Sequence, residues 1–169
     1  NAEVGFRQGF KFGNFYGYLD IAGFMQRYEN TIEYLFGFWG KPEDGGIPVG
    51  FKFVNTGESQ VLGIDASLMG QAFIGKLDTI KKESSGGKLT YLIGYNYISP
   101  KVINRDHVYA KDYNPNADAD NNLSYNSTSL NGEKGYLKYR FLHNVKGDLE
   151  YSIKGFSIGY SCKYFSPIE

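Results

Sequence analysis

The feature that most limits what this chain can fold into is a strict two-residue alternation near its C-terminal end. Over residues 137–153, apolar and aromatic side chains occupy nearly every odd position, and the even positions are mostly charged or polar. Successive side chains of a β-strand point to opposite faces, so the pattern predicts one long strand with an apolar face and a charged face. At about 3.3 Å per residue, seventeen residues span on the order of 55 Å, far more than an ordinary strand.

The same alternation recurs along the chain and predicts six strands. They cover residues 2–13, 15–38, 49–70, 88–98, 136–153 and 156–166. Two of these strands change parity part of the way along. A β-bulge near Glu29–Asn30 would account for the first change, and a bulge at Gly57 for the second. A turn at 55–59 that makes two short strands is the alternative to the second bulge.

The connections between the strands differ in length. Short turns are expected at 13–17 and at 154–155, where Lys154–Gly155 predicts a tight hairpin. A polar connection covers 75–88, and long loops cover 40–48 and 101–134, the latter rich in Asn and Asp. Short connections at one end of the strands and long ones at the other are typical of outer-membrane barrels. No internal repeat and no useful helical periodicity is evident.

The composition supports an all-β protein. The chain has 15 Tyr, 13 Phe and 22 Gly in 169 residues, as expected for strands with aromatic side chains and Gly-containing turns. Its net charge of zero gives no electrostatic support for binding nucleic acid. One Cys and two His give no basis for a disulfide framework or a zinc site, and we expect no cofactor. The sequence contains no run of about 18 apolar residues, so it predicts no transmembrane helix.

Two environments fit a strand with one apolar and one charged face. In a β-sandwich or a lipocalin-like barrel the aromatic side chains pack into a core, and the strands are about five to eight residues long. In a large membrane barrel the aromatic side chains face lipid and the charged ones line a wet interior. A transmembrane strand needs about 9–11 residues. Parity alone does not decide which face is inside, but strand length and aromatic excess favour the membrane.

Three stretches resemble TonB-dependent outer-membrane receptors, especially those of Bacteroidetes-type bacteria. "YLDIAGFMQRYENTIEYLFGF" (18–38) is similar to an ascending strand that ends in a Phe/Gly-rich segment before a loop. "GFKFVNTGESQVLGIDASLMG" (50–70) resembles a descending strand of that family with its Asn-x-Gly element, and 137–169 resembles a late hairpin. The resemblance implies an antiparallel transmembrane β-barrel of about 22 strands, of which residues 1–169 would form an open segment of about six long strands.

The resemblance also implies a function and partners. Such receptors import a scarce nutrient, for example a siderophore, a vitamin, an oligosaccharide or a peptide. Import is driven through a plug domain that the TonB–ExbB–ExbD system engages at a TonB box. The plug and the terminal strands are not in these 169 residues, so we expect the chain to be part of a longer polypeptide in the outer membrane of a Gram-negative bacterium. Lipid, lipopolysaccharide and a surface lipoprotein are the further expected contacts.

Substrate contacts are expected in the outer loops and on the charged face of the wall. The candidates are Trp39, Lys41, Arg105, His107, Asp112, Lys138 and Arg140. Asp118 and Asp120 are weak candidates for a Ca²⁺ site, because the surrounding loop lacks the EF-hand pattern. His143 and Cys162 fall on the apolar parity. No nucleophile with a base at a useful spacing appears, so we expect no enzymatic activity.

Other functions remain open from the sequence. A passive porin, or an outer-membrane component for secretion or adhesion, would have a similar wall without a TonB box. A soluble β-barrel that binds a ligand would have its aromatic side chains in a closed core.

Overall fold

The computed structural model describes residues 1–37, 39, 49–78, 83–112 and 121–168. It is all-β, with mostly antiparallel strands and only short helical pieces. The chain divides into two compact units, and each is described by itself. The sheet unit comprises 1–25, 62–99 and 139–169, and the loop unit comprises 26–61 and 100–138.

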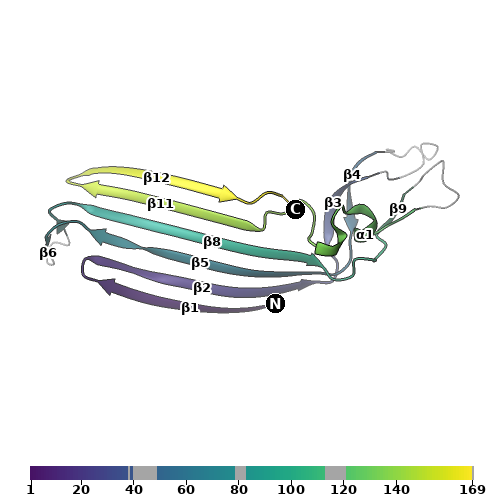
Figure 1. The fold of residues 1–169 in the computed structure, drawn as a ribbon, viewed down its shortest axis with the longest axis horizontal. Helices are drawn as coiled ribbons and strands as arrows, with labels where there is room; N and C mark the ends of the chain where they lie inside the picture. The colour runs from purple at the N-terminus through teal and green to yellow at the C-terminus, as the bar shows by residue number, and fades with distance from the viewer. Residues whose placement is uncertain (38, 40–48, 79–82, 113–120, 169) are drawn as a thin grey trace. The chain divides into compact units, whose positions relative to one another are not determined.

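The sheet unit is built on six strands in the order β1-β2-β5-β8-β11-β12, as the alternation predicted (Figure 1). These strands are β1 (Ala2–Phe12), β2 (Phe15–Tyr28), β5 (Ser59–Phe73), β8 (Lys88–Val102), β11 (His143–Ile153) and β12 (Phe156–Phe165). The order in the sheet is the order in the chain, so the sheet is a meander. It is open, with β1 and β12 at its edges.

The strand register sorts the side chains onto two faces. Phe6 lies opposite Ile21 and Arg7 opposite Asp20, so apolar pairs and charged pairs alternate. The same holds for Leu149, which lies opposite both Tyr91 and Tyr160. We call the two sides the apolar face and the polar face. Within the sheet unit, every charged side chain of the six long strands is on the polar face: Glu3, Arg7, Lys11, Asp20, Asp65, Lys88, Lys146, Asp148, Glu150 and Lys163.

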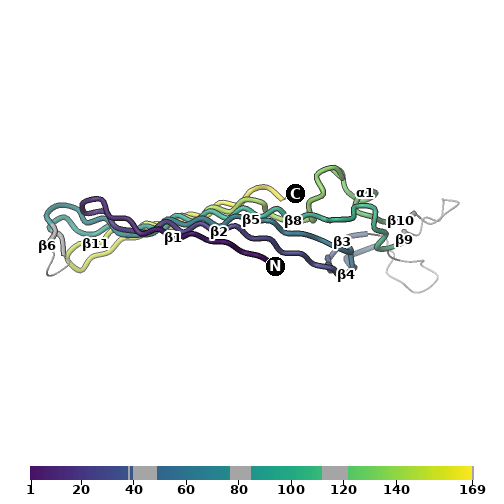
Figure 2. Tube along the Cα trace, turned by 90° about the horizontal axis from the view of Figure 1, so that it is seen from below, coloured from purple at the N-terminus to yellow at the C-terminus, as the bar shows by residue number. Residues whose placement is uncertain are grey.

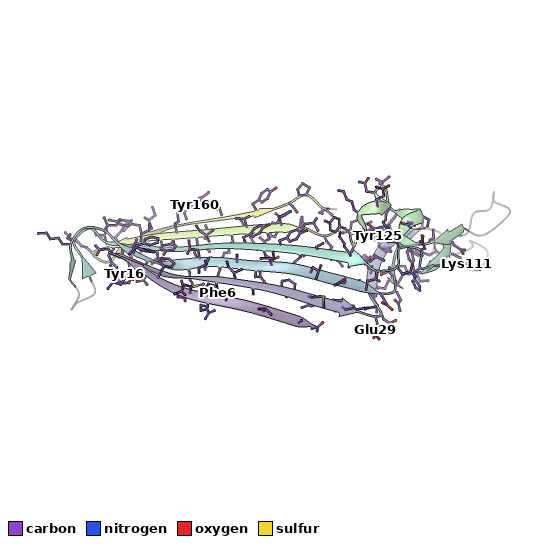
Figure 3. All side chains as sticks on the ribbon, turned by 60° about the horizontal axis from the view of Figure 1, so that its bottom comes forward. Phe6, Tyr16, Glu29, Lys111, Tyr125 and Tyr160 are labelled. Carbon is purple, nitrogen blue, oxygen red and sulfur yellow. The ribbon has the colours of Figure 1, made fainter. Side chains whose placement is uncertain are left out.

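The apolar face has no cover from the described part of the sheet unit. Figure 2, turned by 90°, shows the six strands edge-on as one layer. Figure 3 shows side chains standing on both sides of that layer, with Phe6 and Tyr160 on its two edge strands. Val4 is 81% exposed and Tyr160 is 69% exposed. Monomeric soluble proteins rarely expose so continuous an apolar surface, so this face indicates contact with something outside the described residues.

Tyr91 differs from the exposed aromatic side chains of the apolar face, because only 5% of it is exposed. Its ring stacks on Phe15 at a centroid distance of 4.9 Å, and its hydroxyl donates to the carbonyl oxygen of Tyr16 over 3.1 Å. A Cβ atom added to Gly17 or Gly70 would collide with that hydroxyl. The two glycines therefore leave the space that the Tyr91 side chain fills across three strands.

The short connections agree with the expected turns. Gly13 links β1 to β2 with φ +57°, and Lys154 and Gly155 link β11 to β12 with φ +46° and +82°. Two successive positive φ values are the mark of a tight hairpin turn, as predicted at 154–155. The connection between β5 and β8 contains a further small hairpin of β6 (Leu77–Asp78) and β7 (Glu83–Ser84).

Two predicted strands are each divided, and the bulge expected near Glu29–Asn30 is wrong. β2 ends at Tyr28, and β3 (Ile32–Gly37) pairs with β4 (Gly50–Asn55) instead of joining the main sheet. At 55–59 the alternative prediction, a turn between two strands, is confirmed. Gly57 has φ +88°, and its N–H donates to the side-chain oxygen of Asn55 over 2.9 Å. Such a local side-chain bond turns the chain and ends the ladder.

The predicted strand 136–153 is wrong in its first third, since β11 begins only at His143. Tyr139 has φ +59°, which no strand residue adopts. Leu137 and Leu142 are both buried although their positions have opposite parity. Lys138 and Arg140 therefore do not belong to a strand.

The loop unit holds the rest of the described chain around a small core. It contains the β3–β4 hairpin, β9 (Ala110–Asp112) paired with β10 (Asn121–Leu123), the helix α1 (Tyr125–Thr128) and a 3₁₀ turn at Gly132–Lys134. Val102, Tyr125 and Leu137 pack together in its core. Among the described residues, no helix is long and apolar enough to cross a membrane.

Candidate functional site

Cross-strand polar pairs occupy the polar face of the sheet unit. Arg7 on β1 pairs with Asp20 on β2, with Nε of Arg7 at 2.7 Å from Oδ2. Asp148 on β11 accepts from the hydroxyl of Ser161, which lies directly opposite on β12, and within β11 it also pairs with Lys146, whose Nζ is 2.8 Å from Oδ2. Asn96 donates to Asp65 over 2.6 Å. Opposed groups of this kind stabilise a sheet by roughly 0.2–1 kcal/mol per pair, so they help to fix the register.

An open hollow of about 430 Å³ lies on this face between β1 and β11. Its lining includes three carboxylates, those of Glu3, Asp20 and Asp65, and the ammonium group of Lys146. Oδ1 of Asn144, another lining residue, is buried without a hydrogen-bond partner. The hollow can therefore accept polar groups.

The hairpin end of the sheet unit carries a larger hollow of about 1050 Å³. Its polar-face lining is mostly apolar: Tyr16, Tyr18, Met69, Phe73 and Leu92, with Lys11, Gln71 and Thr90. Lys11 Nζ lies 5.1 Å from the ring centre of Tyr16, and the guanidinium of Arg7 lies 5.6 Å from that of Tyr18. The polar face thus changes along the strands from charged and amide groups to aromatic rings flanked by cations.

The β3–β4 hairpin of the loop unit also has two unlike faces. Glu33, Leu35 and Val54 are buried on one of them. On the other, Tyr34, Phe36, Phe51 and Phe53 form an exposed aromatic ridge, in which the Tyr34 ring lies 4.9 Å from Phe51 and 4.8 Å from Phe53. Phe53 is 71% exposed, and exposed apolar groups of this size are typical of contact surfaces.

Trp39, a predicted substrate contact, lies at the end of this hairpin. Its indole N–H donates to the carbonyl oxygen of Gly50 over 2.7 Å, and its ring covers Gly37. Lys52 Nζ lies 6.0 Å from the ring centre. The side chain therefore packs against its own hairpin.

Lys138 lies in a partly buried polar cluster of the loop unit. Its Nζ donates to the carbonyl oxygen and to the hydroxyl of Thr128, over 2.9 and 2.8 Å. Tyr109 OH is 2.9 Å from the same hydroxyl. Burial lowers the pKa of Lys138, and the charge of Glu33, which is only 5% exposed, acts against that shift. Burial also raises the pKa of Tyr109. The cluster links β3 to the long connection 101–138.

Arg105 and His107 are also held by local contacts. Nη1 of Arg105 donates to the carbonyl oxygens of Gly132 and Glu133 over 2.9 and 3.0 Å. The ring of His107 lies directly over Gly57, where an added Cβ would come within 2.9 Å of it. Both side chains remain exposed, so each can present a polar edge to a ligand.

The other predicted contacts are placed only in part. Arg140 is exposed and follows the turn at Tyr139. The backbone of Asp112 pairs with Asn121 in the short β9–β10 ladder. Lys41, Asp118 and Asp120 lie outside the described residues. Within the described ranges, no three His, Cys, Asp or Glu side chains gather as metal ligands.

Sequence reasoning missed Glu33, Tyr109 and the aromatic ridge as a separate surface. The parity of Ile32, Tyr34, Phe36 and Phe38 contained the signal for the ridge, because it differs from the parity of the preceding segment. A separate hairpin explains that difference better than a bulge. The approach of Glu33 to Lys138 joins residues far apart in the chain, and no local pattern predicts it.

Comparison with known proteins identifies no relative: no family model, no curated protein and no solved structure matches this chain.

Proposed function

We propose that this chain is a wall segment of a TonB-dependent outer-membrane transporter that imports a scarce nutrient. The proposal is an antiparallel transmembrane β-barrel of about 22 strands, to which these six strands contribute. One observation carries it: within the described part of the sheet unit, 1–25, 62–99 and 139–169, the apolar face of the six long strands has no charged residue and no cover, while the charged residues of these strand parts all lie on the polar face. Hydrocarbon on one side and a wet lumen on the other would account for both faces.

Strand length supports the same proposal. The parts of the strands that belong to the sheet unit are 10–12 residues long, close to the roughly 9–11 tilted residues that span a bilayer. Aromatic side chains also gather near both ends of the apolar face. Phe10, Phe12 and Phe15 lie by the first hairpin, and Tyr95, Tyr97 and Tyr164 lie by the opposite end. Such groups are typical of the two membrane–water interfaces.

The two units then take different roles. The polar face would line the lumen, and the loop unit, with its aromatic ridge and with Arg105 and His107 exposed, would capture substrate outside the membrane. Loops on a rigid wall are where binding residues concentrate. Energy would come from the TonB–ExbB–ExbD system through a plug domain of the whole polypeptide.

The lone cysteine gives a direct test of the lipid contact. Cys162 is exposed on the apolar face, and its neighbour Ser161 is on the polar face. In the whole polypeptide embedded in lipid vesicles, a nitroxide on Cys162 is expected to relax faster with oxygen, which concentrates in hydrocarbon, than with a water-soluble nickel chelate. The matched variant, Ser161→Cys in a Cys162→Ser background, is expected to show the reverse order.

The contrary result is equally clear. If the nickel chelate relaxes the nitroxide at Cys162 as strongly as the one at position 161, the apolar face meets water. If both agents are excluded from Cys162, that face is packed in a protein core. Either result contradicts the membrane-wall proposal.

Energy coupling needs a separate experiment, since a passive pore would have the same wall. A strain without the gene is expected to grow more slowly when one nutrient is limiting, tested for iron, cobalamin, oligosaccharides and peptides in turn. Deleting TonB should give the same defect, and the double deletion should add nothing to it. A growth defect that is unchanged by TonB would indicate a passive pore.

A further inference from the structure

Strand β12 presents an open backbone edge to whatever lies beside it. It pairs with β11 along its whole length, from Ile153–Phe156 to Asn144–Phe165, and no described strand lies on its other side. All ten of its residues are exposed. About half of its backbone N–H and C=O groups point away from β11, and in a bilayer such groups must be paired with another strand.

The side chains of β12 restrict which sequence a strand paired with its open edge can have. On the apolar face it carries Phe156, Ile158, Tyr160, Cys162 and Tyr164, all uncharged. On the polar face it carries a single charge, that of Lys163, among Ser, Gly and Phe. A neighbouring strand must therefore alternate with the same period, and its polar-face residues meet Lys163.

Lys163 has no carboxylate partner among the described residues. Directly across the ladder it meets Lys146, a second positive charge. The nearest carboxylate along β11 is that of Asp148, which already binds Lys146 at 2.8 Å and the hydroxyl of Ser161. Nζ of Lys163 lies instead 4.8 Å from the ring centre of Phe165. Like charges placed directly opposite each other destabilise a sheet, and a carboxylate on the open side would offset that repulsion.

We propose that the open edge of β12 binds an antiparallel strand of the same polypeptide, outside these 169 residues, which places an Asp or Glu on the polar face beside Lys163. This inference rests on the proposed barrel wall and specifies the chemistry of its next strand. The carboxylate would complete a row in the order Asp148, Lys146, Lys163, Asp or Glu across three strands. With a negative charge at each end, the row offsets the repulsion between the two lysines.

Carbodiimide coupling of the whole folded polypeptide tests the inference. The reagent joins a lysine amine to a carboxylate only when the two lie within ion-pair distance, and mass spectrometry identifies the joined peptides. We expect an amide bond between Lys163 and an Asp or Glu outside residues 1–169. Lys163→Arg keeps the positive charge but does not couple, so the joined peptide should fall to background while the protein stays folded.

Each other outcome overturns the inference. Coupling of Lys163 to Asp148 or Glu150 would mean that its counter-charge lies within the described sheet. Coupling to Glu3 would mean that β12 meets β1, within one chain or between two copies. No coupling, in samples where the unsubstituted protein and the Lys163→Arg variant both resist denaturation in detergent, would mean that no neighbouring strand brings a carboxylate to Lys163. The nitroxide measurement at Cys162 is independent, so the wall proposal can survive each of these results.

Discussion

At the scale of single residues, several glycines are required by what lies against them. Gly17 and Gly70 make room for the Tyr91 ring, which bridges three strands. A side chain at Gly57 is disfavoured for two reasons: its φ is +88°, and the His107 ring lies over it. At Gly135 only the backbone conformation disfavours a side chain: its φ is +68°, and an added Cβ would meet nothing closer than 3.6 Å.

The pair Gly57 and Gly135 gives a controlled prediction, since both belong to the loop unit. A left-handed conformation costs an L-residue about 1–2 kcal/mol, so Gly135→Ala should lower the free energy of unfolding of this unit by that amount. Gly57→Ala should cost more, because the new methyl group also displaces His107. Amide hydrogen exchange of the loop unit measures both losses.

A second substitution separates the two costs at Gly57. Adding His107→Ala to the Gly57→Ala variant should bring its loss of stability back to the level of Gly135→Ala. If Gly57→Ala alone already equals Gly135→Ala, the His107 ring does not pack on Gly57 and steric contact is not part of the cost.

At the scale of elements, the alternation predicted the six strands of the sheet and the faces of their side chains. It could do so because each strand has one apolar and one polar face over about ten residues, and only one register satisfies both. Most of the charged residues that alternate with apolar ones in the sequence are on the polar face, among them Arg7, Lys11, Asp65, Lys146, Asp148, Glu150 and Lys163.

The two exceptions, Lys138 and Arg140, show where the pattern misleads. Residues 137–142 alternate as a strand would, yet Tyr139 is left-handed and Leu137 and Leu142 are both buried. The alternation is a pattern of residue types along the chain. It does not show where a turn interrupts the strand because nearby polar residues make tertiary contacts. The bond from Lys138 to Thr128 is such a contact, formed between two positions of the long connection.

The candidate site was less predictable than the sheet for the same reason. Trp39, Arg105 and His107 were identified by type and by loop position, but their partners are backbone carbonyls and glycines that no sequence pattern marks, within the same hairpin for Trp39 and in other segments for Arg105 and His107. Such contacts depend on how each loop closes. No periodic signal encodes that closure.

At the scale of the whole molecule, the separation of charge between the two faces gives the most direct energetic prediction. Leu149 lies on the apolar face and Thr90 on the polar face, on neighbouring strands. If the apolar face meets hydrocarbon, Leu149→Lys should destabilise the membrane-inserted protein by about 2–4 kcal/mol near the bilayer midplane. Thr90→Lys adds the same charge to a wet surface and should have little effect.

Refolding into lipid vesicles at increasing urea concentration measures the difference between these two variants. Equal losses for Leu149→Lys and Thr90→Lys would mean that the two faces see the same solvent. A larger loss for Thr90→Lys would place the polar face inside a core and reverse the assignment of the faces.

Two backbone hydrogen bonds join the chain segments at which the β3–β4 hairpin begins and ends. The N–H of Thr31 donates to the carbonyl oxygen of Gly57 over 2.8 Å, and that of Thr56 donates to the carbonyl oxygen of Thr31 over 2.8 Å. These two bonds fix the points at which the hairpin leaves and rejoins the chain, and the buried face with Glu33, Leu35 and Val54 holds it in the loop unit. Substitutions on the exposed face, at Tyr34, Phe36, Phe51 and Phe53, would therefore change the surface offered to a ligand while the pairing of β2 with β5 stays the same.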